Sequence, residues 1–160
     1  MSVRKDILDW IVSLSRPRAA FNGIATCPYA NTADLDIIET VSYNDFIIKL
    51  LRSINNFRFN CNHVDIIVPS VSKDHGDIWL LSEELNKILA KKDLITYVSD
   101  PTRPFVVDGV QTTNEKHLFI ILQQISELAQ TSAHLWRKGY YANWPTDMFD
   151  KIVLPRSVKQ

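Results

Sequence analysis

Hydrophobic residues recur with the period of an α-helix in five segments of the chain. The first segment begins after Ser2, a suitable N-cap, and ends before Pro17, which cannot continue a helix. Thr112 and Glu115 match a capping box ahead of the fourth segment, so we expect one long helix from there to Gly139. The helical segments are residues 3–14, 46–54, 78–92, 118–135 and 146–153.

Short β-branched segments alternate with these helices. Residues 35–41, 63–69 and 94–98 predict strands, and residues 105–107 could add a short edge strand. Strands that alternate with helices usually run parallel and are joined by right-handed crossovers. We therefore expect an α/β sandwich, with a mostly parallel sheet of three or four strands flanked by helices. A ferredoxin-like fold is the alternative, but it has no place for the helix at 78–92.

The composition is that of a globular protein, with 46% hydrophobic and 22% charged residues. The length of 160 residues fits a single α/β domain over residues 1–160. The 18 basic residues balance the 18 acidic ones, which disfavours nucleic-acid binding because it normally needs a basic surface. There are too few cysteines for a disulfide framework, no signal-peptide core and no apolar run long enough for a membrane. We expect a cytoplasmic protein without membrane contact.

Polar residues follow the predicted strands at their carboxyl ends. Ser70, Lys73 and His75 follow the second strand, and Asp100 and Arg103 follow the third. In open parallel sheets, ligands bind just beyond these ends, and helix N-termini there favour anions. We expect a small polar or anionic molecule to bind at this edge, unless these are ordinary solvated loops. Neither of the glycine-rich phosphate-binding motifs, G-x-x-x-x-G-K-(S/T) and G-x-G-x-x-G, occurs in the sequence, which disfavours nucleotide binding by those routes.

A distinctive tetrapeptide, Cys-Pro-Tyr-Ala, occupies residues 27–30 in the long loop before the first strand. It resembles the redox motif Cys-Pro-Tyr-Cys, but Ala30 replaces the resolving cysteine, so dithiol exchange has no second thiol here. Cys27 could still act as a nucleophile if Arg18 lowered its pKa, and Arg18 and Tyr29 would then contact the ligand. The alternative is a buried structural cysteine, the common situation of a free thiol.

Asp100 and His117 are candidates for acid–base catalysis. We expect His117 near the start of the long helix, where the helix dipole favours a neutral imidazole. Such an imidazole close to Asp100 and Arg103 could act as a general base, or it could simply be a helix-surface histidine.

Cys61 and His63 alternate along a strand and could chelate a metal ion, but no established zinc spacing occurs. We therefore expect no metal and no cofactor.

An aromatic segment with basic residues lies at the end of the predicted long helix. Its rings are those of Trp136, Tyr140, Tyr141 and Trp144. Exposed aromatic clusters of this kind often form the centre of a protein interface. We therefore expect either a partner-protein surface or a cap that holds the last helix on the core.

A tryptophan-containing helix around residues 10–12 is followed by the Cys-Pro loop at residues 27–30. This arrangement resembles an uncharacterised bacterial family of small domains, in which a short helix with tryptophan precedes a loop ending in a Cys-Pro-Phe-Ala-type motif. The sequence departs from that pattern by inserting residues 16–21 and by carrying tyrosine instead of phenylalanine. The resemblance implies that the Cys-Pro loop is a family feature, and it implies no activity.

Two hypotheses of function follow from the sequence. The first is an accessory or ligand-binding domain that recognises a small polar or anionic molecule or a partner protein. The alternative is an enzyme that uses Cys27 as a nucleophile, or Asp100 and His117 as acid and base.

Overall fold

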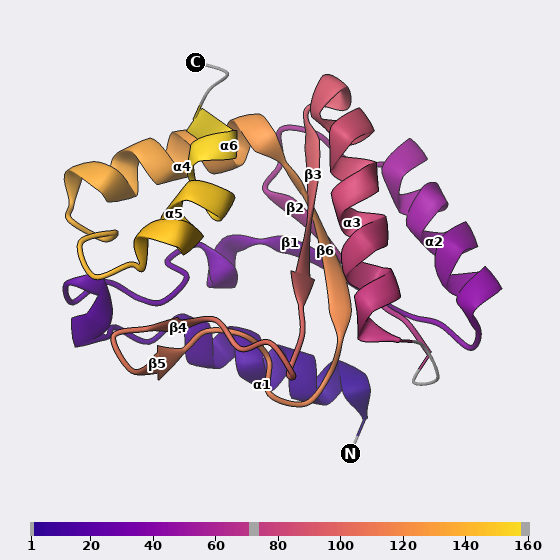
Figure 1. The fold of residues 1–160 in the computed structure, drawn as a ribbon, viewed down its shortest axis with the longest axis horizontal. Coiled ribbons are helices and arrows are strands. Elements are labelled where there is room, and N and C mark those ends of the chain that lie inside the picture. The colour runs from indigo at the N-terminus through magenta and orange to yellow at the C-terminus, as the bar shows by residue number, and fades with distance from the viewer. Residues whose placement is uncertain (1, 71–73, 158–160) are drawn as a thin grey trace.

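A four-stranded sheet lies at the centre of the fold (Figure 1). The computed structural model describes residues 2–70 and 74–157. The strands lie in the order β1 (Asp34–Glu39), β2 (His63–Val68), β6 (Phe119–Gln124) and β3 (Leu94–Ser99). β1 is parallel to β2, whereas β6 is antiparallel to both β2 and β3. It follows that β1, β2 and β3 all point the same way and β6 runs against them.

The expectation of a mostly parallel sheet is wrong, because two of its three strand pairings are antiparallel. The error arose at residues 112–135, which form β6 followed by α4 (Ile125–Arg137) instead of one helix. β6 is a central strand covered on both faces, so its apolar residues show no alternation and also fit a helical stripe. The capping box predicted at Thr112 and Glu115 is wrong, because no helix begins there. Instead, the Asn114 side chain accepts a hydrogen bond from the His117 amide at 2.8 Å, in a turn that leads into β6.

Two helices, α2 (Tyr43–Asn55) and α3 (His75–Leu89), cover one face of the sheet (Figure 1). A capping box begins α2 directly after the first strand. Ser42 Oγ accepts a hydrogen bond from the Asp45 amide at 3.1 Å, and the Asp45 carboxylate accepts one from the Val41 amide at 3.0 Å. The core between these helices and the sheet includes Phe46, Leu50, Ile54, Ile67, Ile78, Leu94, Ile120 and Leu122.

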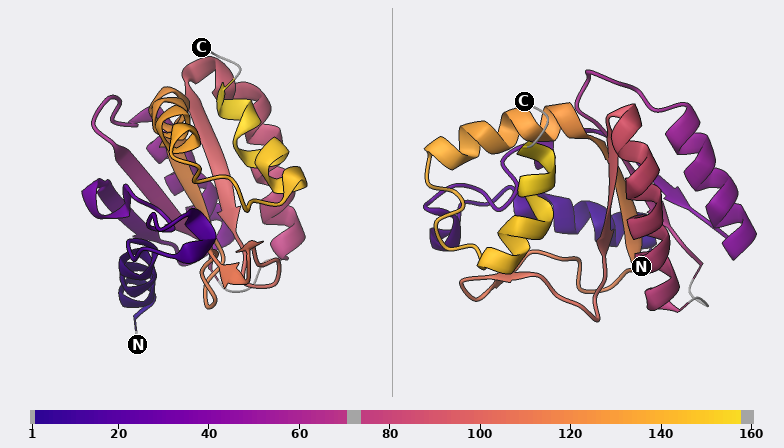
Figure 2. Two further views of the ribbon diagram at one scale, coloured as in Figure 1. Left: turned by 90° about the vertical axis from the view of Figure 1, so that its left-hand side faces the viewer. Right: turned by 45° about the horizontal axis from the view of Figure 1, so that its top comes forward.

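The helix α1 (Val3–Leu14) lies on the opposite face, as the left view of Figure 2 shows. The predicted N-cap is confirmed, since Ser2 Oγ accepts a hydrogen bond from an amide of the first turn at 3.3 Å. Buried Ile7 packs with Ile66 and Phe119 of the sheet. The helix α1 covers only part of this face, and residues of β1, β2 and β6 also border a cavity lined by α4.

A second core, beside the sheet, joins segments from both ends of the chain. It contains Ala20, Phe21, Val107, Leu135, Tyr140, Tyr141 and Val153. The predicted last helix is confirmed as α5 (Thr146–Ile152), and α6 (Leu154–Ser157) follows it. The predicted short strand is β4 (Val106–Val107), which pairs with β5 (Val110–Gln111) in a separate two-stranded sheet.

The long loop predicted between the first helix and the first strand is also present. It contains two 3-10 turns, η1 (Ala19–Phe21) and η2 (Ala30–Thr32), and a third, η3 (Ala90–Lys92), extends α3. Across the described residues, no helix is both long enough and apolar enough to span a membrane.

Candidate functional site

The carboxyl ends of β1, β2 and β3 meet at one edge of the sheet, which we call the carboxyl rim. Asp100 follows β3 there and is completely buried. Its carboxylate accepts hydrogen bonds from His75 Nδ1 at 2.7 Å and from Trp79 Nε1 at 2.9 Å. The backbone amide and the hydroxyl of Thr102 donate two more, each at 2.8 Å. The loop after β3 and the start of α3 are therefore joined through one carboxylate.

This hydrogen bonding fixes the charge of Asp100 and the orientation of His75. Burial by itself raises the pKa of Asp100, but the hydrogen bonds from Trp79, His75 and Thr102 outweigh it and lower the pKa to about 2. Because the ionised carboxylate accepts the His75 Nδ1–H, the other ring nitrogen, Nε2, is available for proton exchange. The His75 side chain is 36% exposed, so solvent can reach it.

The other residues predicted for this edge are placed less closely together. The Arg103 guanidinium lies 5.4 Å from the centre of the Trp79 ring, within the range of a cation–π contact. Ser70 follows β2 at the same rim and is partly buried. Lys73 lies outside the described residues. The structure thus brings His75, Asp100 and Arg103 together around Trp79.

His117 does not pair with Asp100 as the sequence suggested. Its Nε2 lies 2.9 Å from a carboxylate oxygen of Asp6 in α1, and Lys116 Nζ lies 2.8 Å from the other oxygen. These hydrogen bonds, that of Lys116 first, lower the pKa of Asp6 to about 2. His117 therefore ties the turn before β6 to α1.

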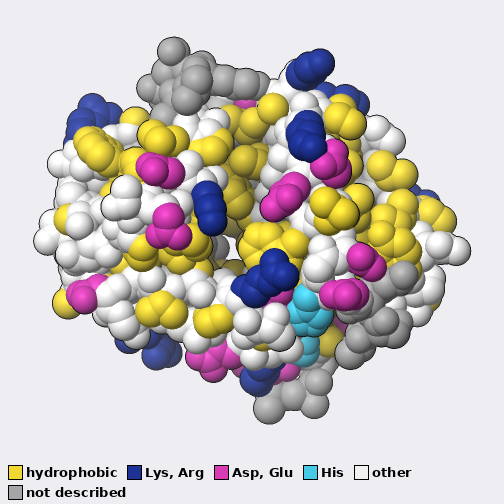
Figure 3. All heavy atoms as spheres, viewed as in Figure 1, with side chains coloured by type: hydrophobic (Ala, Val, Ile, Leu, Met, Phe, Trp, Pro, Cys, Tyr) yellow, Lys and Arg dark blue, Asp and Glu magenta, His cyan; other side chains and the backbone are white. Residues whose placement is uncertain are grey.

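A cavity of about 260 Å³ lies on the α1 face of the sheet. Its walls come from α1, the Cys-Pro loop, the strands β1, β2 and β6, and the chain from α4 to α6. Figure 3 shows a hollow among hydrophobic side chains near the centre of the molecule, between the region of α4–α6 and the sheet. Among the residues that line it are Trp10, Cys27, Ala33, Tyr140, Trp144 and Arg156.

Cys27 lines this cavity but is poorly suited to act as a nucleophile. Its backbone amide donates to the Leu14 carbonyl at 2.7 Å, which fixes the loop to the end of α1. Burial raises the pKa of the Cys27 thiol, although hydrogen bonds from the amides of Tyr29 and Ala30 act in the opposite direction. A raised pKa leaves little thiolate at neutral pH, and the thiolate is the reactive form.

Arg18 and Tyr29, predicted to bind a ligand beside Cys27, are placed differently from each other. Tyr29 lines the cavity, whereas the exposed Arg18 does not. The cation in the cavity wall is Arg156 of α6, which local sequence patterns did not single out. Arg156 Nε donates to the Tyr97 hydroxyl at 2.8 Å, and one terminal nitrogen donates to Ser132 Oγ at 3.3 Å.

Three of the four aromatic residues predicted for a partner surface instead line the cavity. Tyr140 and Tyr141 are buried and Trp144 is partly buried, whereas Trp136 is 60% exposed. The Tyr140 ring stacks on Phe21 with 5.1 Å between centroids, and its hydroxyl donates to the Thr26 carbonyl. The arrangement is that of the alternative we considered, a cap that holds the chain end on the core.

One polar atom of a residue that lines the cavity has no partner among the described residues. Trp144 Nε1 is buried and forms no hydrogen bond with any described residue. By contrast, Trp10 Nε1 donates to the Thr112 carbonyl at 3.1 Å and Trp79 Nε1 to Asp100. A buried indole N–H normally finds an acceptor, so Trp144 marks a position where a bound group could accept a hydrogen bond.

Fold and site together define an α/β protein with a mixed sheet, a hydrogen-bonded rim on one edge and a cavity on one face. Comparison of the chain with protein-family models, curated proteins and solved structures gave no match. The resemblance to an uncharacterised bacterial family therefore stays a prediction. Function has to be argued from the two sites themselves.

Proposed function

We propose that this protein binds a small, largely apolar molecule that carries one hydrogen-bond-accepting or anionic group. The observation that carries the proposal is the cavity of about 260 Å³, whose lining includes Trp144, a residue with a buried and unpaired Nε1–H. Pockets for small molecules are mostly apolar and contain a few well-placed polar groups. Apolar walls favour an amphipathic ligand over the wholly polar one suggested by the loops of the rim.

The buried indole N–H favours a ligand that can accept a hydrogen bond. A buried donor without an acceptor costs about 1–3 kcal/mol. A ligand whose acceptor reaches Trp144 Nε1 would offset that cost and would gain packing contacts with the apolar walls. Arg156 lines the same cavity, and its positive charge favours an anionic group such as a carboxylate.

The same cavity disfavours the thiol enzyme. Cys27 faces a ligand with a thiol whose pKa is raised by burial, so it contributes shape and polarisability to the wall. A partner protein is also less well supported, because Tyr140 and Tyr141 are buried within the chain.

Binding can be tested by isothermal titration calorimetry with aromatic carboxylates, such as benzoate and 4-methylbenzoate, and with toluene as the uncharged counterpart. We expect saturable binding of the carboxylates to one site, and weaker binding of toluene. Ala33→Leu adds volume inside the cavity and should weaken carboxylate binding at least about tenfold. Ala142→Leu, in an exposed position, should leave it unchanged.

Two results would contradict the proposal. One is a failure of every aromatic carboxylate to bind saturably to the folded wild-type chain. The other is equal binding by Ala33→Leu and wild type, with circular dichroism showing that both variants fold. The first result would remove the proposed ligand class, and the second would place binding outside the cavity.

The His75–Asp100 pair favours a second function, proton transfer at the carboxyl rim. An ionised, buried carboxylate that orients an exposed imidazole is the arrangement of a general base. Acylation of His75 by diethyl pyrocarbonate tests this directly. We expect faster modification of His75 than of His134, and slower modification of His75 in Asp100→Asn. Equal rates for His75 in Asp100→Asn and wild type would contradict a role of Asp100 in activating it.

A further inference from the structure

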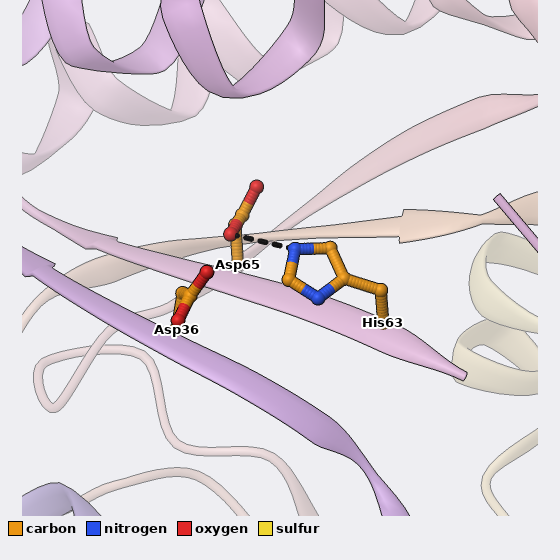
Figure 4. Close-up of side chains that lie close together, drawn as sticks. All are labelled: Asp36, His63 and Asp65. Carbon is orange, nitrogen blue, oxygen red and sulfur yellow. Dashed lines mark hydrogen bonds and ion pairs between the residues drawn. The ribbon is translucent and has the colours of Figure 1, made fainter. Parts of the chain in front are cut away.

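Three side chains that can ligate metal lie together on the face of the sheet that α2 covers (Figure 4). Asp36 comes from β1, and His63 and Asp65 come from β2. His63 and Asp65 alternate along β2 and therefore share a face, and Asp36 is the register partner of Asp65 on the parallel neighbour. One ligand atom from each of the three lies within 4.8 Å of the other two. The backbone pairing therefore fixes the three positions.

The surroundings of His63 match those of a histidine that ligates metal. Its Nε2 faces Asp65 Oδ1 at 3.0 Å, while its Nδ1 lies 3.2 Å from Asp34 Oδ2 and 3.0 Å from Arg58 NH2. Metal-bound histidines commonly donate the other ring N–H to a carboxylate, which fixes the orientation of the ring. Arg58 holds that carboxylate in turn, with 2.8 Å between its NH1 and Asp34 Oδ2. The cluster thus has an inner set of ligands and an outer carboxylate.

The charges of the cluster favour an added cation. His63 and Asp65 have only 3% and 6% of their side chains exposed. Carboxylates directly opposite each other on neighbouring strands destabilise a sheet, and Asp36 and Asp65 are such a pair. Arg58 and His63 face three carboxylates, those of Asp34, Asp36 and Asp65. A divalent ion between Asp36 and Asp65 would offset this repulsion.

We propose that Asp36, His63 and Asp65 bind a divalent transition-metal ion. One imidazole nitrogen with two carboxylate oxygens suits Zn²⁺ and related ions better than Mg²⁺, which prefers oxygen ligands alone. Asp36 has 58% of its side chain exposed and lies on the edge strand β1, so the ion can enter from solvent and keep a water ligand on that side. Arg58 NH2 lies 3.1 Å from Asp36 Oδ2 and 3.0 Å from His63 Nδ1, and it gives up both contacts when the ion binds, so that Nδ1–H can donate to Asp34.

The site and the cavity share one residue, His63, which is also among the residues that line the cavity. The two aspartates belong to the other face of the sheet. The carboxylate of Asp65 accepts a hydrogen bond from Ser53 of α2, whereas Val64 and Ile66 face the α1 side. It also differs from the pair of Cys61 and His63 considered from the sequence. Cys61 Sγ lies 3.4 Å from the Arg58 carbonyl and belongs to none of the three ligand positions.

Titration calorimetry of the full chain with Zn²⁺ and with Mn²⁺ tests the proposal, in a Cys61→Ser background that removes the exposed thiol. We expect one Zn²⁺ per chain, bound at least about tenfold more tightly than Mn²⁺. Sites with nitrogen and oxygen ligands generally bind Zn²⁺ more tightly than Mn²⁺. Asp36→Asn should weaken Zn²⁺ binding at least about tenfold without changing the melting temperature of the metal-free protein, since Asp36 is exposed. Asp9→Asn, an exposed carboxylate of α1, is the matched control and should bind like the parent.

Visible absorption of the Co²⁺ form supplies a second readout, because it reports a nitrogen and oxygen environment without thiolate. The proposal is overturned if the Cys61→Ser protein binds no Zn²⁺. It is also overturned if Asp36→Asn and Asp9→Asn bind Zn²⁺ equally well.

Discussion

The carboxyl rim and the cavity differ in how completely their polar groups are paired. At the rim, the indole N–H of Trp79 donates to Asp100, which also accepts hydrogen bonds from His75 and Thr102. In the cavity, the indole N–H of Trp144 has no acceptor among the described residues. A fully paired group stabilises the fold by itself, whereas an unpaired one costs free energy that a ligand can recover. We therefore assign stability chiefly to the rim and ligand binding to the cavity.

The largest expected effect on stability is that of Asp100→Ala. The change leaves Trp79, His75 and Thr102 without their common acceptor in a buried position, so we expect a loss of about 3 kcal/mol or more in the free energy of unfolding. Urea denaturation measures it. The control Asp150→Ala, at an exposed helix position, should stay within about 0.5 kcal/mol of wild type. A loss as small as the control's would contradict the central role of Asp100.

Acid should remove much of the same contribution. The pKa of Asp100 is lowered to about 2 in the folded protein, so its stabilisation is present above the unfolded pKa of about 4 and is lost as the pH falls towards 2. The loss from this group is of the order of 2 kcal/mol. Asp100→Asn should show a correspondingly shallower decline between pH 4 and pH 2 in urea denaturation. Parallel profiles for the two proteins would refute the assignment.

Matched substitutions of two indoles compare the regions directly. Trp79→Phe removes a hydrogen bond to a carboxylate and should cost about 1.5–2 kcal/mol. Trp144→Phe removes a donor that has no protein acceptor, so stability should change by less than about 0.5 kcal/mol or increase. Trp136→Phe, at an exposed ring, controls for the change of ring size. A larger loss for Trp144→Phe than for Trp79→Phe would reverse our comparison.

The smallest expected effect concerns the two thiols. Cys27 lies in the cavity wall with a pKa raised by burial, whereas Cys61 is exposed. At neutral pH a disulfide reagent such as Ellman's reagent should modify Cys27 at least about tenfold more slowly than Cys61. The single variants Cys27→Ser and Cys61→Ser isolate each rate. Rapid modification of Cys27 would restore the hypothesis of a nucleophilic thiol.

Local sequence patterns predicted much of the fold and the position of the carboxyl rim, but not the cavity. The capping box at Ser42 and the strands β1 to β3 are set by nearby residues, and helices that cross over between strands keep these strands pointing one way. The contact of His75 with Asp100 follows from that shared direction, even though β6 lies between β2 and β3. Local residues could not reveal β6, because a strand buried on both faces lacks alternation.

The cavity could not be predicted because its walls come from remote parts of the chain. Tyr140 donates to the carbonyl of Thr26, 114 positions away, and Arg156 joins the wall from the last helix. The metal cluster depends in the same way on the register of Asp36 with Asp65. The sequence shows that His63 and Asp65 alternate along one strand. The third proposed ligand, Asp36, could be found only by knowing how β1 pairs with β2.

The most direct test of ligand binding is the ¹⁵N–¹H signal of the Trp144 indole during a titration with benzoate. Its four tryptophans give the chain four indole signals, which single Trp→Phe variants assign. We predict a saturable downfield shift of the Trp144 indole proton as the carboxylate accepts its hydrogen bond, with the paired indole of Trp79 unmoved. A Trp144 signal that stays fixed while benzoate binds, or moves no more than that of exposed Trp136, would contradict the account.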